Sequence, residues 1–338
     1  MPRPVPVIAL TGYLGAGKTS LLNHVLRQPG ARVGVVVNDF GDLNVDAGLV
    51  TGQVDEPAAI TGGCLCCLSD TDELDSALER LASPRLRLDA IIVEASGLAD
   101  PATLARLIRF SGTDGVRPGG IVDVVDAVRH HETVDRDPRP PARYGVASLV
   151  VVNKLDQLPA AERDAAVDAV ASRVHQLNPR AHVVGAVGGR IDPGLLYDVA
   201  DPAEDPGQLP LRELLLADTG SHPHVHADSV TVTAPGGADP ARVVALLEDP
   251  PPGVYRMKGT VTVRPGTVWR SYTVNVVGHS LHVASSRHAA PGSELVAIGL
   301  HLDGEAVRAA LTAAVAPVDG TPPAAGFRRL QRYRRLSL

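Results

Sequence analysis

The chain has 338 residues, a length typical of about two domains, and 44% of its residues are hydrophobic. Only 3% are aromatic, so the core must be built mainly from Ala, Val and Leu. The formal net charge of -6 argues against nonspecific binding of nucleic acid. We expect no membrane-spanning segment, because no apolar stretch approaches the roughly 20 residues that a span requires.

The N-terminus and the cysteine usage predict a cytoplasmic protein. The chain runs directly into the apolar stretch 5–10 and a glycine-rich loop, so a signal peptide would have to be cut through functional residues. The three cysteines are an odd number clustered in one segment, which does not resemble a secreted disulfide framework. We therefore expect a reducing compartment.

The first half of the chain alternates short apolar runs with helical patterns, which is typical of a parallel α/β sheet. The runs are continuously apolar, as expected where helices cover both faces of the sheet. The predicted strands are 5–11, 32–37, 88–94, 119–125, 147–152 and 181–185.

Several segments between these strands carry helix start signals. Asp70 and Glu73 resemble a capping box, and Asp100-Pro101 combines an N-cap with a proline in the first turn. A further amphipathic helix covers 167–174 and should stop near Asn178-Pro179. The segment 209–216 is predicted to be the last helix of the first domain.

The second half predicts a smaller α+β domain with its helices on one sheet face. Its predicted strands are 229–233, 254–263, 270–277, 280–285 and 294–299, and its helices are 239–248 and 304–315. Residues 317–338 are expected to be irregular. The predicted organisation is a phosphate-loop nucleotide-binding domain (1–220), a His-containing linker (221–228), the small domain (229–316) and a basic tail (317–338).

The segment 12–19 has the pattern Gly-x4-Gly-Lys-Thr directly after a predicted strand and at the start of a helix. In this context the backbone N–H groups surround phosphate oxygens and the positive helix end faces them. Lys18 is expected to contact the β and γ phosphates, and the Thr19 hydroxyl to ligate Mg²⁺. The predicted phosphate-binding residues are Gly12, Gly15, Ala16, Gly17, Lys18, Thr19 and Ser20.

Acidic residues follow two other strands of the predicted sheet. Glu94 ends the strand 88–94 and is placed to hold Mg²⁺ through water, and Gly97 could offer an amide to the γ-phosphate. Asp39 and Asp42 lie in the segment after the strand 32–37, which could sense the γ-phosphate or orient the attacking water. Each of these two acids is equally compatible with a turn or cap role.

Asn153-Lys154-Leu155-Asp156 follows the strand 147–152 and predicts selectivity for guanine. The Asp156 carboxylate can accept hydrogen bonds from the N1–H and 2-amino groups of guanine. Adenine lacks that pair of donors and would leave the carboxylate unpaired. Lys154 would pack over the base and Asn153 would brace the loop, so the expected nucleotide is GTP.

All three cysteines lie in Cys64-Leu65-Cys66-Cys67, directly after two glycines. Thiolates suit Zn²⁺ and other soft or borderline ions, and three ligands leave a tetrahedral site incomplete. The incomplete set predicts a ligand from elsewhere, an open position or a metal that leaves. Redox sensing by neighbouring thiols is the main alternative at this segment.

Histidines at the predicted domain junction offer a weaker metal site. His222, His224 and His226 alternate, so on an extended strand they would share one side and could hold a metal transiently. A solvated linker explains them equally well. His130 and His131 fall in a polar, proline-rich segment and are expected to be exposed rather than ligating.

These motifs together resemble the CobW family of P-loop GTPases, which includes zinc metallochaperone-like proteins. The resemblance extends over about 300 residues, since 229–316 also looks like the family's C-terminal domain. The segments that carry it are 11–23, 38–42, 62–67, 94–101, 124–127 and 153–156. Two features depart from family members: Val37 stands where some have Glu, and the histidine run is reduced to three residues.

The resemblance implies a slow, metal-stimulated GTPase that binds Zn²⁺ or Co²⁺ through Cys64, Cys66 and Cys67 and passes it to a client metalloprotein. Candidate partners are this client and a second copy of the chain in a GTP-dependent homodimer. The alternatives are cobalt delivery for corrin synthesis and a GTP-dependent regulator whose cysteines are structural or redox ligands. Binding of nucleic acid by the basic tail is a minor alternative.

Overall fold

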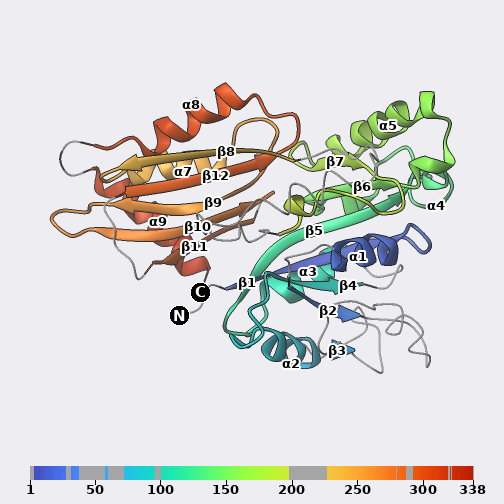
Figure 1. Ribbon diagram of the computed structural model, residues 1–338, viewed down its shortest axis with the longest axis horizontal. Coiled ribbons are helices and arrows are strands. Elements are labelled where there is room, and N and C mark those ends of the chain that lie inside the picture. Colours follow the sequence, from blue (N-terminus) through green and yellow to red (C-terminus); the bar gives the residue numbers. More distant parts are fainter. Residues whose placement is uncertain are drawn as a thin grey trace, which may run out of the picture.

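The computed structural model describes residues 4–27, 32–37, 58–59, 72–95, 100–197, 227–278, 280–286, 292–318, 320 and 322–337. Within these ranges the chain forms two sheets, each with its own helices (Figure 1). The first sheet contains the N-terminal half of the chain and the second sheet the C-terminal part. None of the described helices is long and apolar enough to cross a membrane.

The first sheet has seven strands in the order β3-β2-β4-β1-β5-β6-β7, and all its described neighbours are parallel. The six longer strands correspond to the six predicted ones. Their bounds are β1 Val5–Gly12, β2 Val33–Val37, β4 Ala90–Glu94, β5 Val116–Asp126, β6 Leu149–Asn153 and β7 His182–Gly185, with the two-residue β3 at Ala58–Ala59.

Helices cover both faces of this sheet, as the continuous apolar runs predict. Along β1, Ile8 and Leu10 face the core that contains α1, whereas Val7 and Ala9 face the core of α2 and α3. α5 packs beside the latter face, over β6. The bounds are α1 Lys18–Leu26, α2 Asp72–Leu81, α3 Pro101–Arg109, α4 His130–Thr133 and α5 Arg163–His175, with short 3-10 turns at Ala142–Gly145, Leu155–Gln157, Ala160–Glu162 and Pro193–Leu195.

The start of α3 confirms the predicted cap. The Asp100 carboxylate accepts hydrogen bonds from the backbone N–H groups of Ala102 and Thr103, and Pro101 occupies the first helical position. These bonds satisfy backbone donors that have no partner within the helix.

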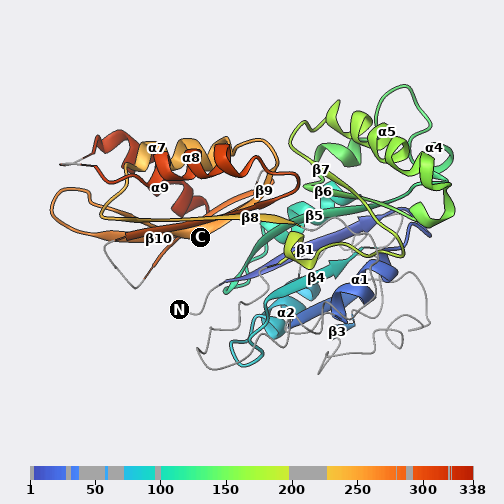
Figure 2. The ribbon, with the colours of Figure 1, turned by 45° about the horizontal axis from the view of Figure 1, so that its top comes forward.

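The second sheet has five antiparallel strands in the order β11-β10-β9-β12-β8, with the helices on one face (Figure 2). The buried side chains of this face and of the helices form one aliphatic core. The bounds are β8 Asp228–Pro235, β9 Val254–Val263, β10 Arg270–Val277, β11 Ser280–Ser285 and β12 Gly292–Gly299, with α7 Pro240–Glu248 and α8 Gly304–Val315.

The prediction that residues 317–338 are irregular is wrong, because Ala324–Leu336 forms the helix α9. The five arginines within the helix and the prolines before it made the segment look irregular in the sequence, although it contains an apolar stripe. Phe327, Leu330 and Tyr333 lie three residues apart and pack against the core of the second sheet. Arg329 forms an ion pair with Glu248 of α7, which fixes the helix further.

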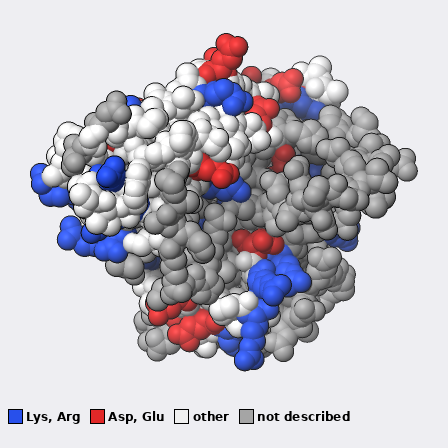
Figure 3. Space-filling view, turned by 60° about the vertical axis from the view of Figure 1, so that its left-hand side comes forward, with Lys and Arg blue, Asp and Glu red and all other residues white. Residues whose placement is uncertain are grey.

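The described residues of one face of the molecule carry charges of both signs. In the view of Figure 3, Lys and Arg side chains lie in separate groups with Asp and Glu side chains between them. Among the described residues of this face, the basic side chains are not gathered into one continuous patch.

Side chains of both sheets meet at a shared interface. Arg180 donates to the Glu248 carbonyl oxygen at 2.7 Å and forms an ion pair with Asp249 at 2.9 Å. Arg256 of β9 donates to the Gly194 carbonyl oxygen at 3.1 Å. The buried Tyr255 hydroxyl lies 3.4 Å from the Ser148 hydroxyl. The C-terminal part of the chain is therefore attached to the segments that precede β6 and β7 and to the turn after β7.

Candidate functional site

The predicted nucleotide residues meet at one edge of the first sheet. Because β1, β4, β5 and β6 are parallel, their carboxyl ends share that edge, where α/β folds bind ligands. The edge holds the phosphate loop after β1, Glu94 at the end of β4 and the segment 153–156 at the end of β6. It also holds Asp126, the last residue of β5, which belongs to the segment 124–127 but received no functional role from the sequence.

The phosphate loop connects β1 to α1, as the motif predicts. α1 begins at Lys18, so its N-terminal backbone donors face the loop. Gly17 has φ +101°, and a Cβ atom added there would lie 2.2 Å from Asn153 Nδ2. Glycine is therefore required at this position by both the backbone conformation and the neighbouring side chain. Ser20 is exposed on the first turn of α1.

Lys18, Thr19 and Glu94 lie around the same loop. Lys18 Nζ donates to the Gly12 carbonyl oxygen at 3.0 Å, so the ammonium group lies over the loop. Thr19 Oγ1 lies 3.4 Å from Glu94 Oε1, and the Glu94 carboxylate is buried. Thus β4 and α1 bring a hydroxyl and a carboxylate together beside a cation.

Asn153 joins the 153–156 segment to the phosphate loop. Its side chain is 1% exposed. Nδ2 donates to the Ala16 carbonyl oxygen at 3.0 Å, and Oδ1 accepts from the Gly189 N–H at 2.8 Å. Both ends of the amide are therefore used, which fits the predicted bracing role of this residue.

Lys154 and Asp156 extend from this braced position. Lys154 has φ +65°, a left-handed conformation that is uncommon for residues other than glycine. Its Nζ lies 2.7 Å from Asp126 Oδ2. Asp156 lies in the following 3-10 turn and is exposed, so its carboxylate is accessible to a ligand.

The segment after β7 is a further part of the site that our sequence reasoning missed. The Ala186 carbonyl oxygen accepts from the Leu155 N–H at 3.2 Å. Gly189, at φ +74°, lies so close to α1 that an added Cβ atom would be 2.4 Å from the Leu21 nitrogen. Gly188-Gly189 after a strand was the available signal, because paired glycines allow such a close backbone approach.

The remaining predicted site residues lie outside the described parts of the chain. They are Asp39, Asp42, Gly97, Cys64, Cys66, Cys67, His222, His224 and His226.

A cavity of about 1140 Å³ lies between the two sheets, beside the 153–156 segment. Its walls include α5, β7 and the proline-rich segment 249–254, and Asp156 also lines it. No residue of the phosphate loop lines it. The cavity therefore adjoins the expected base position rather than the expected phosphate position.

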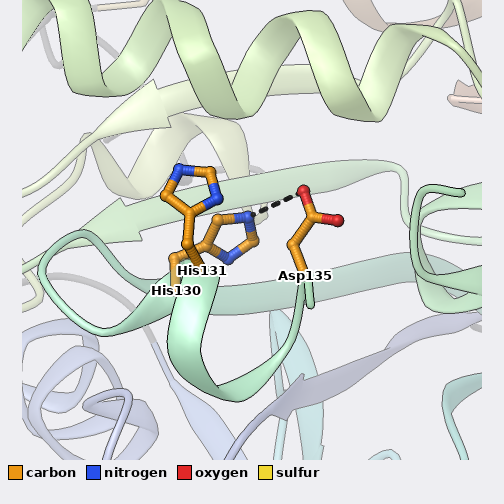
Figure 4. A group of neighbouring side chains, drawn as sticks. All are labelled: His130, His131 and Asp135. Carbon is orange, nitrogen blue, oxygen red and sulfur yellow. Dashed lines mark ion pairs between the residues drawn. The ribbon is translucent and has the colours of Figure 1, made fainter. Parts of the chain in front are cut away.

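His130, His131 and Asp135 form a separate group near α4 (Figure 4). Their potential ligand atoms lie within 4.8 Å of one another. However, Asp135 forms a bidentate ion pair with Arg173, and His130 Nε2 lies 3.0 Å from the Tyr144 hydroxyl. A metal ion would lie beside the Arg173 guanidinium, so we interpret the group as a structural network.

This network corrects the prediction for His130, which is 1% exposed rather than solvated, whereas His131 is exposed as expected. The Tyr144 hydroxyl and Asp135 accommodate the imidazole in the interior. Burial and the neighbouring His131 lower the pKa of His130 to about 4, although Asp135 acts in the opposite direction. His130 is therefore neutral at pH 7.

The lowered pKa of His130 predicts a loss of stability in mild acid. The unfolded chain binds a proton at about pH 6.5, whereas the folded chain does so only near pH 4. The free energy of unfolding should therefore fall as the pH decreases from about 6.5 to about 4, by at most about 3 kcal/mol for this residue. Urea unfolding at pH 7 and pH 5 measures the loss.

His130→Gln should reduce that pH dependence, because glutamine can still bind Tyr144 but does not titrate. Part of the dependence should remain, since burial also lowers the pKa of His182 and of His282 to about 4. An identical loss of stability in the variant and the parent chain would contradict the assignment to His130.

Taken together, the sheet, the loop and the braced 153–156 segment define a nucleotide-binding α/β domain of the P-loop class. The chain belongs to the CobW/HypB/UreG family: the model of its nucleotide-binding domain matches residues 6–185. The model of the cobalamin synthesis protein CobW C-terminal domain matches residues 227–315. The family prediction is thus confirmed.

Named relatives match at about one third identity. The zinc chaperone CobW of a Sinorhizobium species is 30% identical, covering 92% of this chain and 97% of the relative. The zinc chaperone YjiA of Escherichia coli K12 is 32% identical, covering 58% of this chain and 62% of the relative. The zinc-regulated GTPase metalloprotein activator 1 of Schizosaccharomyces pombe is 32% identical, covering 56% of this chain and 47% of the relative.

Among solved structures, the Zn(II)-bound YjiA GTPase from E. coli aligns with 92% of this chain and 99% of its own, at 22% identity and a TM-score of 0.43. The nickel complex of HypB from Helicobacter pylori aligns with 65% of this chain and 92% of its own, at 18% identity and a TM-score of 0.42.

Proposed function

We propose that the chain is a GTP-hydrolysing metallochaperone that binds a transition metal and transfers it to a client protein. The observation that carries the proposal is the bond from Asn153 to the Ala16 carbonyl oxygen. It joins a guanine-selecting segment to a phosphate loop in a chain that also has three clustered cysteines. Relatives that are named zinc chaperones support zinc as the cargo.

The phosphate side of the site would hold GTP through backbone donors and one lysine. The backbone N–H groups of the loop and of the first turn of α1 would bind the α and β phosphates. Lys18 would exchange its bond to the Gly12 carbonyl oxygen for the β and γ phosphates. Water would attack the γ-phosphorus and GDP would leave, with Asp39 or Asp42 as candidates to orient that water.

The residues around the loop fit Mg²⁺ as the cofactor. Thr19 Oγ1 and Glu94 Oε1 are oxygen donors, which Mg²⁺ prefers, and they lie 3.4 Å apart. When bound, Mg²⁺ would neutralise negative charge on the phosphates. Thr19 would supply a ligand from α1, and the buried Glu94 carboxylate would act from the end of β4, directly or through water.

The base side would select guanine. The exposed Asp156 carboxylate would accept from the N1–H and 2-amino groups of guanine, and Lys154 would lie over the base. Gly97 would contribute an amide near the γ-phosphate.

The cargo would be bound by Cys64, Cys66 and Cys67 in a reducing cytoplasm, which keeps the thiols available as ligands. Zn²⁺ is the expected metal and Co²⁺ the alternative, since both accept thiolate ligands. His222, His224 and His226 are candidates for transient contacts with the metal. The client is a metalloprotein, and a GTP-dependent homodimer is a candidate assembly.

A Zn²⁺ titration with and without a nonhydrolysable GTP analogue tests the proposal. Coupling is reciprocal, so GTP should tighten Zn²⁺ binding by the same factor by which Zn²⁺ tightens GTP binding. We expect a change of about tenfold, within the usual range for linked sites. Equal Zn²⁺ affinities in the two conditions would contradict nucleotide-coupled metal transfer, and failure to load an apo-client would favour a regulatory role.

A further inference from the structure

We propose that Asp126 positions Lys154 against the guanine base and so determines affinity for the base rather than for the phosphates. The inference rests on the proposed function, because it assigns a residue to the same nucleotide site. It concerns a residue that neither the phosphate loop nor the 153–156 segment contains.

Asp126 lies at the edge of the sheet beside the guanine-selecting segment. It is the last residue of β5 and is the register partner of Asn153 in β6. The Ala127 N–H donates to the Asn153 carbonyl oxygen at 2.9 Å, which extends the pairing of the two strands by one residue. The carboxylate is therefore placed by two paired strand ends rather than by a free loop.

Both oxygens of the Asp126 carboxylate accept from donors in the described parts of the chain. Oδ2 lies 2.7 Å from Lys154 Nζ, and Oδ1 accepts from the N–H groups of Val128 and Arg129 at 2.9 and 3.1 Å. Burial raises the pKa of Asp126, but the bonds from Lys154 and these amides outweigh burial and hold the pKa below its usual value. The group stays ionised at neutral pH and acts as a fixed anchor.

Lys154 needs such an anchor. Its left-handed backbone conformation is unfavourable for a residue with a Cβ atom. The bond from the Leu155 N–H to the Ala186 carbonyl oxygen holds the backbone on one side, and Asp126 holds the side chain on the other. The Lys154 side chain is 27% exposed, so part of its stem remains accessible.

These contacts suit the stem for packing against a planar base. With Nζ bound to Asp126, the methylene groups are held in one orientation, and the charge is neutralised locally. A base that is hydrogen-bonded by Asp156 would then lie on an apolar surface. Without Asp126 the ammonium group would return to water, and the base would lose this contact.

Asp126→Asn removes the bond to Lys154 while it keeps the bonds that hold the end of β5. Asparagine Oδ1 can still accept from the amides of Val128 and Arg129, whereas its Nδ2 cannot accept from Lys154. We expect the dissociation constants of GDP and of the GTP analogue to rise by the same factor, about tenfold, as for the loss of one charge-assisted hydrogen bond. The turnover number at saturating GTP should change by less than about threefold, because the reacting phosphates are untouched.

Calorimetric titrations with GDP and with inorganic tripolyphosphate distinguish base contacts from phosphate contacts. Tripolyphosphate has no base, so its affinity should be the same in Asp126→Asn and in the parent chain. Asp239→Asn, which changes the carboxylate that caps α7 beside the C-terminal sheet, is the matched control and should bind GDP normally. Thermal unfolding of both variants checks their folding.

Lys154→Met keeps an apolar stem but removes the ammonium group. The double variant Asp126→Asn, Lys154→Met should therefore bind GDP no more weakly than Asp126→Asn alone. Unchanged GDP affinity in Asp126→Asn, an equal loss of tripolyphosphate affinity, or additive effects in the double variant would each overturn the positioning role. A parent chain that fails to bind GDP would instead overturn the proposed function itself.

Discussion

Lys18→Ala should reduce GTP hydrolysis by at least about 100-fold, the scale seen when one group that stabilises transition-state charge is removed. Lys18 is the only cation in the segment 12–19, and its ammonium group already lies over the loop through the Gly12 carbonyl oxygen. Alanine keeps the helical conformation at this position but cannot neutralise charge on the β and γ phosphates. Phosphate release at saturating GTP measures the effect.

Arg109→Ala is a suitable control, because it removes an exposed cation at the end of α3 from the same domain. It should hydrolyse GTP like the parent chain. The Lys18→Ala variant should still take up zinc weakly, since its three thiols are intact. Unchanged hydrolysis in this variant would remove the phosphate-loop assignment, whereas loss of zinc uptake as well would indicate that metal binding requires the nucleotide.

Much of the fold was predictable because both sheets are made of clear local patterns. Strands buried on both faces, such as β4 and β6, are continuous apolar runs that end at polar residues. In the C-terminal sheet, the bounds of β9, β10, β11 and α8 coincide with the predicted ones. Turn residues rich in glycine and proline separate these elements, so their ends are marked in the sequence.

The errors arise where tertiary contacts override local composition. α9 has five arginines, and its apolar stripe is visible only against the core on which it packs. The sequence around His130 is typical of an exposed segment, but the side chain is buried, where its ring contacts the Tyr144 hydroxyl and the Asp135 carboxylate. Neither partner is implied by the polar, proline-rich composition around His130.

The same reasoning explains which parts of the candidate site were predictable. Gly17, Lys18 and Asn153 belong to motifs with fixed spacing, because the backbone itself forms the binding surface. Asp126 and Gly189 act on those motifs from other strand ends. The role of Asp126 depends on the order of the strands, which a single sequence does not reveal, whereas the pair Gly188-Gly189 was a signal that the sequence did offer.

Replacement of Cys64, Cys66 and Cys67 by serine should abolish zinc uptake and any stimulation of GTP hydrolysis by zinc. We expect the zinc affinity to fall by at least about 1,000-fold, because the neutral serine hydroxyl replaces each thiolate and structural zinc sites derive their binding free energy from such ligands. Serine matches cysteine in shape, so nucleotide binding should persist. Metal analysis after gel filtration and phosphate release with and without zinc measure the two effects.

The histidine alternative is tested in parallel by His222→Ala, His224→Ala and His226→Ala combined, which should alter zinc affinity by less than about threefold if these residues make only transient contacts. The parent chain and the histidine variant are measured with a reductant that contains no thiol, so that disulfide formation cannot imitate a loss of ligands. The thiol-free variant contains no other cysteine, because the chain has three in all. Zinc uptake and zinc-stimulated hydrolysis that survive in that variant would exclude the cysteines as cargo ligands, and the metallochaperone proposal would then fail even if GTP hydrolysis were intact.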